Sequence, residues 1–279
     1  MFGQIFKSEL DLIETHLRAV MQFEYFLRDL PQLSRFVESM NYSLFSEGKR
    51  FRPLLAVLTA KALEKPREQV LPLAAAVELI HTYSLIHDDL PCMDNDDFRR
   101  GLPTNHKMFG EAGALLAGDS LLTMAFGILA QSPSPRAAMA VALLSEAAGP
   151  RGMVGGQVLD IEAQKPTKEL LKQIHARKTG KLIQVSVEGA AALCEATTKQ
   201  IQDLKTYGEL LGLAFQLADD LQDFDEGDPE KVSYASTLGV PETIRYLEET
   251  SEQALACLSS FGSSAEGLRQ MIKLNRDRV

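Results

Sequence analysis

The sequence predicts an all-α protein, a single-domain bundle of about ten or more helices, from two kinds of observation. Apolar residues recur at helical spacing, as at Val70, Leu73 and Val77. Good helix formers fill most segments, and alternating strand patterns bounded by turn residues are absent. Proline and glycine divide the helices at short intervals without a long polar linker, so we expect one domain over residues 1–279.

Composition narrows the class of protein. The net charge is −9, which argues against a nucleic-acid partner. The cysteines lack metal-ligand spacing and indicate reduced thiols, so we predict a cytoplasmic location; they are Cys92, Cys194 and Cys257. The longest apolar stretches, around Leu71–Ile86 and Leu121–Ala130, are interrupted before the roughly 18–20 residues of a membrane helix. We therefore expect no stable membrane association.

Two long apolar helices are each predicted to end in an aspartate cluster. The first cluster contains Asp88, Asp89 and Asp94, and the second contains Asp219, Asp220 and Asp223. Negative charge at a helix C-terminus opposes the helix dipole by about 0.3–1 kcal/mol per group, so a merely solvated helix end explains two clusters poorly. Carboxylate oxygens suit Mg²⁺, which completes its shell with phosphate oxygens.

The geometry of each cluster follows from local sequence. Pro91 is expected to break the first helix near Asp89 and let Asp94 fold back towards Asp88. If the second helix continues, Asp219 and Asp223 share one of its faces.

Basic segments occur where a phosphate site would use them. They are Gly48-Lys49-Arg50-Phe51-Arg52-Pro53, Arg99-Arg100 and Lys178-Thr179-Gly180-Lys181. Each alone would be an ordinary surface feature. Together with the acidic clusters they indicate diphosphate binding, which needs both charge neutralisation and directional donors.

In chain order, these motifs resemble those of the trans-isoprenyl diphosphate synthase family. The set also includes Gly155-Gly156-Gln157-x-x-Asp160 and Phe215-Gln216-x-x-Asp219-Asp220. The short-chain bacterial or plastid type is indicated by the extra residues Pro91 and Cys92 in the first aspartate motif. The resemblance spans residues 45–235 and implies an isoprenoid synthase-like bundle around a central cavity.

The resemblance implies substrates, a cofactor and residue roles. The substrates would be isopentenyl diphosphate and an allylic diphosphate, and the cofactor roughly three Mg²⁺ ions per active site. Three aspartates would bind these ions directly, namely Asp88, Asp94 and Asp219. Asp89, Asp220 and Asp223 would support them, partly through water. Asp223 is therefore counted with the metal-binding residues. Arg99, Lys178 and Gln216 would contact the allylic diphosphate, and Thr179 would lie near the reacting carbons. Lys49, Arg52, His81 and Arg100 would hold the isopentenyl diphosphate.

His81 has two other interpretations. It lies on an apolar helix and could be a satisfied core histidine. Glu78-x-x-His81 also matches one half of a di-iron bundle motif, but such bundles need two copies and this chain has one.

After the second cluster the chain departs from the family pattern. Lys231-Val232-Ser233-Tyr234 resembles a later family run, so Lys231 is a further candidate for diphosphate binding. An earlier lysine and several loop residues are missing, which puts one diphosphate contact or the closure of the site in question.

Product length is predicted to depend on Tyr83. This residue lies five positions before Asp88, about 7.5 Å along a helix, where the resemblance implies that a bulky ring limits the product to fifteen carbons. Ser84 beside it is small and leaves room. The alternative is that Tyr83 is ordinary packing.

The sequence therefore predicts a prenyltransferase that makes farnesyl diphosphate, and a homodimer by resemblance. Geranylgeranyl or geranyl diphosphate synthase is the main alternative. A terpene cyclase would not need the second diphosphate site that Lys49, Arg52 and Arg100 suggest. A non-catalytic regulatory subunit stays open because of the altered loop, although both aspartate clusters are intact.

Overall fold

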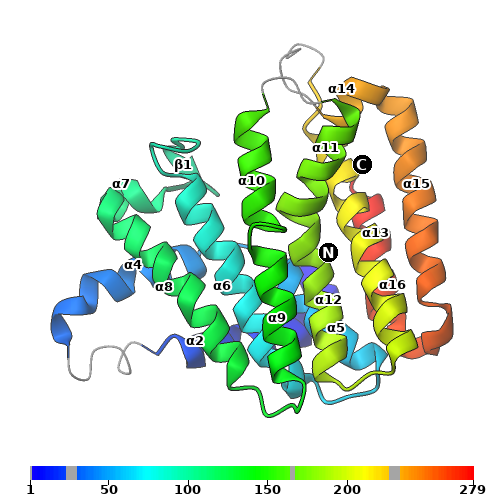
Figure 1. The fold of residues 1–279 in the computed structure, drawn as a ribbon, viewed down its shortest axis with the longest axis horizontal. Helices are drawn as coiled ribbons and strands as arrows, with labels where there is room; N and C mark the ends of the chain where they lie inside the picture. Colours follow the sequence, from blue (N-terminus) through cyan, green and yellow to red (C-terminus); the bar gives the residue numbers. More distant parts are fainter. Residues whose placement is uncertain (1, 23–29, 164–166, 226–232) are drawn as a thin grey trace. The chain divides into compact units, whose positions relative to one another are not determined.

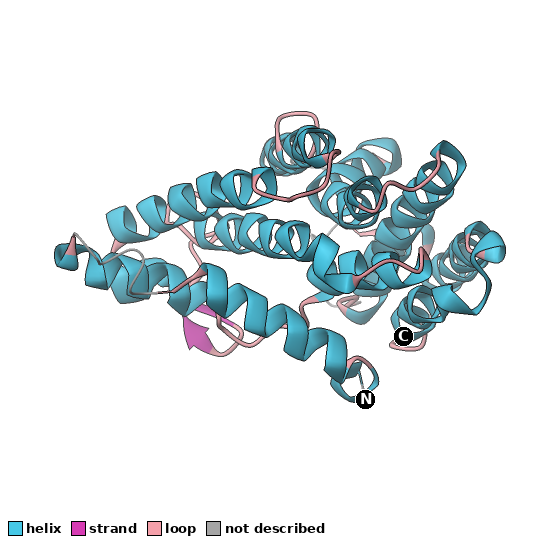
Figure 2. Ribbon diagram, turned by 90° about the horizontal axis from the view of Figure 1, so that it is seen from below, coloured by secondary structure: helices cyan, strands magenta, loops and turns pink. Residues whose placement is uncertain are grey.

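The computed structural model describes residues 2–22, 30–163, 167–225 and 233–279. Helices make up most of this part of the chain, which confirms the predicted all-α class, and a short antiparallel hairpin is added to them (Figure 2). The chain divides into two compact units, Met1–Leu54 with Leu71–Ser132 and Leu55–Val70 with Pro133–Val279. The expectation of a single domain stays a prediction.

The first unit contains the first aspartate cluster. Its elements are α1 (Phe2–Ile5), α2 (Lys7–Val20), η1 (Pro31–Leu33), α4 (Ser34–Leu44), α6 (Leu71–Asp88), β1 (Phe98–Arg99), β2 (Leu102–Pro103), α7 (Asn105–Phe109) and α8 (Glu111–Ala130). Helix α5 (Phe51–Ala62) begins in the first unit and continues into the second.

The second unit contains the second aspartate cluster. Its elements are η2 (Arg67–Val70), α9 (Ala137–Ala148), α10 (Met153–Glu162), α11 (Lys168–His175), η3 (Ala176–Gly180), α12 (Lys181–Leu193), α13 (Thr198–Gln222), α14 (Tyr234–Leu238), α15 (Val240–Cys257), η4 (Ser259–Ala265) and α16 (Glu266–Arg276).

Helix α6 is the central helix of the first unit. Most of its residues are buried, because it is apolar around nearly its whole circumference and must be covered on all sides. Helix α8 packs along it, and the two lie side by side in Figure 1. A Cβ on Gly118 of α8 would lie 2.1 Å from Nε2 of His87, so glycine leaves room for the imidazole where it lies. The packing fixes the end of α6, where the first cluster begins.

Helix α12 has the corresponding place in the second unit. All residues of α12 after Lys181 are buried, and the helix packs against α9 and α13 (Figure 1). Glycines on α13 allow close contact: Cβ atoms on Gly208 and Gly212 would lie 2.9 Å from the Cα atoms of Gln184 and Gly180. The backbone of α13 is therefore held directly against η3 and α12.

The expectation that no apolar segment reaches the length of a membrane span is wrong. Within the described residues, Arg67–Asp88 and Glu111–Ala130 are long and apolar enough by length and composition alone. Pro72 does not interrupt the first, because it lies in the first turn of α6, where proline is tolerated. Most of its apolar window, 72%, is buried, as in the core helix of a globular protein, whereas 33% is buried in the second.

A reciprocal cap begins α13, the helix that carries the second cluster. The Thr197 side chain accepts from the Gln200 N–H, and the Gln200 side chain accepts from the Thr197 N–H. We expect Thr197→Ala to lower the free energy of unfolding by about 1 kcal/mol, because it leaves backbone donors of the first turn without their acceptor. Thermal unfolding measures the change, and Thr198→Ala, at the exposed neighbouring position, is the control. Equal melting temperatures for the two variants would contradict the assigned role of the cap.

Candidate active site

The first aspartate cluster folds back on the end of α6. Helix α6 ends at Asp88, and the N–H of Asp94 donates to the Asp88 carbonyl at 2.8 Å. The Leu90 carbonyl accepts from the N–H groups of Met93 and Asn95, and Asn95 has the left-handed backbone conformation that asparagine tolerates. The predicted return of Asp94 towards Asp88 is confirmed.

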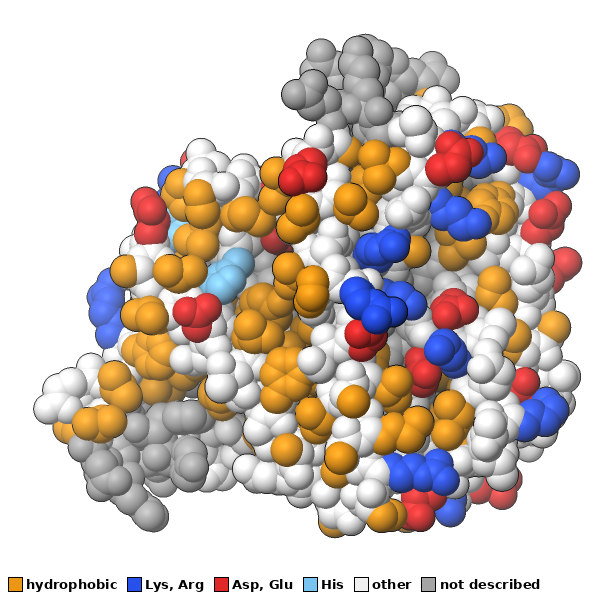
Figure 3. Space-filling view, in the orientation of Figure 1, with side chains coloured by type: hydrophobic (Ala, Val, Ile, Leu, Met, Phe, Trp, Pro, Cys, Tyr) orange, Lys and Arg blue, Asp and Glu red, His pale blue; other side chains and the backbone are white. Residues whose placement is uncertain are grey.

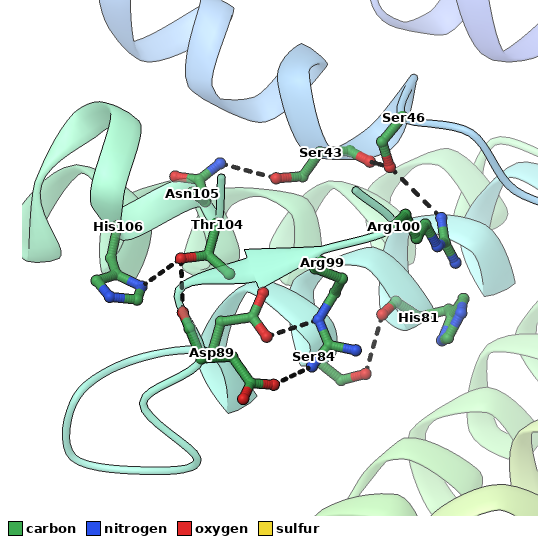
Figure 4. Close-up of polar contacts among 11 residues, drawn as sticks. Ser43, Ser46, His81, Ser84, Asp89, Arg99, Arg100, Thr104, Asn105 and His106 are labelled. Carbon is green, nitrogen blue, oxygen red and sulfur yellow. Dashed lines mark hydrogen bonds and ion pairs between the residues drawn. The ribbon is translucent and has the colours of Figure 1, made fainter. Parts of the chain in front are cut away.

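Asp89 is buried and paired with Arg99. The Asp89 Oδ1 accepts from Arg99 Nε at 2.6 Å (Figure 4). Asp96 Oδ2 accepts from Arg99 Nη2 at 3.1 Å. Burial raises the pKa of Asp89, and the guanidinium of Arg99 opposes that shift. Arg99 therefore links two carboxylates of the acidic loop, and Asp89 anchors this arginine.

The hairpin of β1 and β2 positions Arg100. Arg100 and Gly101 form its turn, and both have positive φ, of 54° and 78°. The Arg100 guanidinium donates to Ser46 Oγ at 3.4 Å (Figure 4). A Cβ on Gly48 would lie 2.8 Å from Arg100 Nη1, so glycine leaves room for the guanidinium. Arg100 therefore lies beside the segment that contains Lys49.

Arg50 is a structural residue in the middle of the Lys49–Arg52 segment. It is buried, has φ 48°, and pairs with Glu14 at 2.6 Å and with Glu78 of α6 at 2.9 Å. A buried guanidinium needs such partners, because an uncompensated buried charge is strongly destabilising. The two ion pairs fix the backbone between Lys49, which is exposed, and Arg52.

His81 lies near four arginines, Arg50, Arg52, Arg99 and Arg100, which we call the arginine group. Its pKa is lowered well below the usual value, first by burial and then by the nearby positive charges of Arg52, Arg100, Arg99 and Arg50. His81 is therefore neutral near pH 7. The structure thus brings together three of the four residues expected to hold one diphosphate, namely Arg52, His81 and Arg100.

The second aspartate cluster lies at the end of α13. The Asp223 N–H donates to the Asp219 carbonyl at 2.9 Å, which confirms that the helical turn continues through both residues. Asp220 is buried and accepts from the Tyr234 N–H at 2.7 Å and from Gln216 Nε2 at 2.9 Å. Asp220 therefore anchors the start of α14, and the Gln216 side chain orients the Asp220 carboxylate.

Arg278, beyond the end of α16, is paired with Asp219. Its Nη1 lies 2.6 Å from Asp219 Oδ1, and its Nη2 donates to the Phe215 carbonyl at 2.8 Å. The guanidinium lies over the Phe215 ring, 4.5 Å from its centroid. Burial raises the pKa of Asp219, while the charge of Arg278 opposes the shift.

Lys178 and Thr179 lie on η3, a π-helical turn between α11 and α12. Lys178 Nζ pairs with Asp160 Oδ2 of α10 at 2.6 Å, and Thr179 is half-buried. A Cβ on Gly156 would lie 2.3 Å from the Lys178 backbone nitrogen. The Gly155-Gly156-Gln157 and Lys178-Thr179-Gly180 motifs therefore form one packed unit.

Comparison with known proteins identifies the family. The family model described as polyprenyl synthetase matches residues 34–233. The chain belongs to the polyprenyl synthetase family. It is 48% identical over 236 residues to the farnesyl diphosphate synthase of Geobacillus stearothermophilus, covering 77% of this chain and 79% of that one. It is 40% identical over 245 residues to a chloroplastic geranylgeranyl pyrophosphate synthase of Capsicum annuum, covering 81% and 66%.

Solved structures of polyprenyl synthetase relatives share the fold. An apo FPP/GFPP synthase from Zymomonas mobilis is 36% identical, with a TM-score of 0.89 and 98% of each chain covered. A geranyltransferase from Legionella pneumophila is 34% identical, with a TM-score of 0.89, covering 100% of this chain and 98% of that one. These likenesses confirm the fold class predicted from the sequence.

The predicted product-length residues of this polyprenyl synthetase lie on α6. Tyr83 is buried, and its ring makes an edge contact with the His87 ring, with 5.7 Å between centroids. Burial and the charge of Asp88 raise the Tyr83 pKa to about 12, so the phenol stays protonated. Ser84 is half-buried and donates to the His81 carbonyl at 2.9 Å. Lys231, the last candidate, lies outside the described residues.

The aspartates fit the Mg²⁺ that the family implies. No group of three or more potential ligands lies preassembled within the described residues. Mg²⁺ binds through one or two carboxylates and completes its shell with water and substrate phosphate. Asp88 and Asp219 are half-buried, and Asp94 and Asp223 are exposed, so these hard oxygen donors are accessible.

Sequence reasoning missed the residues that hold the candidate site in place. Arg50 stood inside a recognised motif, and Glu78 was considered only as half of a di-iron pattern. Their sequence signal is a charged residue at a buried position, which requires an opposite charge. Arg278 stands in the basic tail Lys273–Val279, for which the sequence indicated only a cap over the isopentenyl site, and its pairing with Asp219 had no local signal.

Gly156 is predicted to determine the position of Lys178. In Gly156→Ala the new Cβ meets the backbone of η3, so α10 and η3 must separate, and both stability and polyprenyl synthetase activity should fall. Overpacking of this kind costs about 1–3 kcal/mol. Thermal unfolding and a turnover assay measure the two effects. Val158→Ala, at an exposed position of the same helix, should change neither, and a Gly156→Ala variant with normal turnover would show that this approach is dispensable.

Proposed function

We propose that this chain is a short-chain trans-prenyltransferase that joins isopentenyl diphosphate to dimethylallyl or geranyl diphosphate and yields farnesyl diphosphate. The observation that carries the proposal is the presence of both aspartate clusters in a chain 48% identical to the farnesyl diphosphate synthases of Geobacillus stearothermophilus and Bacillus subtilis. Geranylgeranyl synthases among its relatives reach 40% identity. The family match spans parts of both compact units, which supports one catalytic domain.

The allylic diphosphate would be held by the two clusters. Asp88, Asp94, Asp219 and Asp223 are the carboxylates that would bind roughly three Mg²⁺ ions on a single diphosphate. When bound, the metal would supply electrostatic stabilisation of the charge that develops on the leaving diphosphate. Asp89 and Asp220 have a different task, since each is buried and anchors a neighbouring segment, Asp89 through Arg99 and Asp220 through Tyr234.

The isopentenyl diphosphate would bind to Lys49, Arg52 and Arg100 beside His81. Guanidinium groups bind phosphate oxygens through paired N–H donors, which suits a diphosphate better than a single point charge. A neutral His81 adds a hydrogen bond without adding charge. Lys178, Gln216 and Lys231 are further candidates for diphosphate contact, and Thr179 for a place near the reacting carbons.

The reaction needs positioning more than a protein nucleophile. The allylic carbon–oxygen bond breaks, and both electrons leave with the diphosphate. The double bond of isopentenyl diphosphate then attacks the allylic cation, forming a carbon–carbon bond, and a proton is lost to the departed diphosphate. The residues above act by fixing both diphosphates, so that the reacting carbons lie close together and water is excluded.

A homodimer is supported by an apolar surface on α8. Leu115 and Leu116 are 47% and 54% exposed, and only a third of the apolar window of this helix is buried. Figure 3 shows hydrophobic side chains gathered over the part of the face where α8 lies in Figure 1. Exposed apolar patches of this kind mark protein interfaces, and a second copy is the partner we propose. The cytoplasmic location stays a prediction, since some relatives are chloroplastic.

Product analysis tests the proposed reaction. The chain is incubated with Mg²⁺, isopentenyl diphosphate and, in separate reactions, dimethylallyl, geranyl or farnesyl diphosphate, and the products are separated by chain length. We expect farnesyl diphosphate from the first two primers. Asp88→Asn should lower turnover by about 10²-fold or more, as loss of one stabilising group in a charged transition state does. Asp97→Asn, which removes an exposed carboxylate paired with Lys107, is the control and should retain turnover. Absence of condensation with every primer would favour a regulatory subunit.

Tyr83 is expected to limit product length. Tyr83→Ala removes a buried ring from α6 and should lengthen the main product beyond fifteen carbons. Tyr83→Phe keeps the ring and should leave the product unchanged, which separates ring volume from the hydroxyl. Chromatography of the products decides, and an unchanged length in Tyr83→Ala would assign Tyr83 to packing alone.

A further inference from the structure

The Asp219 carboxylate is bound by a cation of the protein itself. Arg278 Nη1 lies 2.6 Å from Asp219 Oδ1, the distance of a charge-assisted hydrogen bond. The same guanidinium donates to the Phe215 carbonyl and lies over the Phe215 ring. Gln222 binds both the backbone and the side chain of Arg278. Its Nε2 donates to the Arg278 carbonyl at 2.8 Å, and its Oε1 accepts from Arg278 Nη1 at 3.2 Å. Several contacts therefore hold the Arg278 guanidinium in this position, unlike an isolated ion pair on the surface.

We propose that Arg278 is the resident counter-cation of Asp219 and that a divalent metal ion must displace it to bind there. The proposal rests on the metal role of Asp219 in the proposed function. A metal ion and a guanidinium compete for the same carboxylate charge, and they repel each other at the short distances that shared ligation would require. Arg278 therefore lowers the affinity of the second cluster for metal.

The contact is constructed so that it can open. Arg278 lies beyond α16, so its side chain can leave Asp219 without unwinding a helix. Asp219 keeps 33% of its side chain exposed and Arg278 keeps 18%, so water and ions reach the pair. The Arg278 Nε is buried and has no hydrogen-bond acceptor among the described residues, so the guanidinium is only partly satisfied where it lies.

Without a metal ion, this pairing has a clear benefit. Asp219, Asp220 and Asp223 place three carboxylates at the C-terminal end of one helix, where the dipole is unfavourable to them. Of these, Asp220 is satisfied by the Tyr234 N–H and Gln216. Arg278 compensates the charge of Asp219 until the substrate brings metal. Exchange of one cation for another keeps the cluster neutralised in both states.

Metal titration without substrate tests the proposal. Mn²⁺, a magnetic substitute for Mg²⁺, is titrated into the full chain at low salt, and free Mn²⁺ is measured by its paramagnetic resonance signal. Arg278→Gln should bind Mn²⁺ about tenfold more tightly than the unchanged protein, about 1.4 kcal/mol. Arg278→Lys keeps the charge but loses the stacking over Phe215 and the second donor, so its affinity should lie between those of Arg278→Gln and the unchanged protein. The control is Arg276→Gln, which removes an exposed arginine paired only with Asp277 among the described residues and should have no effect.

The Asp219→Asn variant distinguishes the proposed metal role of Asp219 from the proposed counter-cation role of Arg278. If this variant binds Mn²⁺ as the unchanged protein does, Asp219 is not a ligand, and both its metal role and the counter-cation proposal fail. If Asp219→Asn weakens binding while Arg278→Gln matches the unchanged protein or binds more weakly, only the counter-cation proposal is overturned. Neither measurement depends on condensation activity.

Hydrogen exchange supplies a readout of the displacement itself. In the unchanged protein, Mg²⁺ should increase exchange in the peptide that covers residues 273–279, because release of Arg278 also loosens the bonds to Gln222. Asp219→Asn should show fast exchange there without metal. A peptide that exchanges equally with and without Mg²⁺ would overturn the proposed displacement.

Discussion

The structure depends on how carboxylates at the ends of two helices are compensated. Both α6 and α13 end in aspartates, where the helix dipole and neighbouring charges oppose ionisation. In each cluster one aspartate, Asp89 or Asp220, is buried and satisfied by fixed donors. The aspartates beside them, such as Asp88 and Asp219, stay more accessible. The buried carboxylate of each cluster fixes the backbone at the helix end. The accessible carboxylate beside it is held in position by that backbone and can still exchange one bound cation for another.

Close backbone packing positions the remaining groups. The Gly155-Gly156-Gln157 motif is one of those that carry the family resemblance, and its second glycine acts sterically, since a Cβ there would meet the Lys178 nitrogen. The π-helical turn that bears Lys178 is held from the other side by Gly212, which approaches Gly180. The chemistry of Lys178 thus depends on two residues that have no side chain.

Local features were predictable from the sequence, and long-range pairing was not. The end of α6, the return of Asp94 and the shared turn of Asp219 and Asp223 follow from proline chemistry and helical spacing. The Asp219–Arg278 pair could not be predicted, because charge patterns do not give distance between segments far apart in sequence. The π-helical turn at Lys178 could not be predicted, since a π-turn arises from packing and has no reliable local signal.

The arginine group around His81 shows why an anion is the expected ligand of the first unit. Arg50 is neutralised by Glu14 and Glu78, and Arg99 by Asp89 and Asp96. The carboxylates thus fix two of the arginines. Burial lowers the pKa of His81 first, and the nearby charges of Arg52, Arg100, Arg99 and Arg50 lower it further. Like charges held together by a rigid loop repel, and a bound dianion would relieve that repulsion. The concentration of arginines around His81 therefore agrees with the proposed binding of a diphosphate at this place.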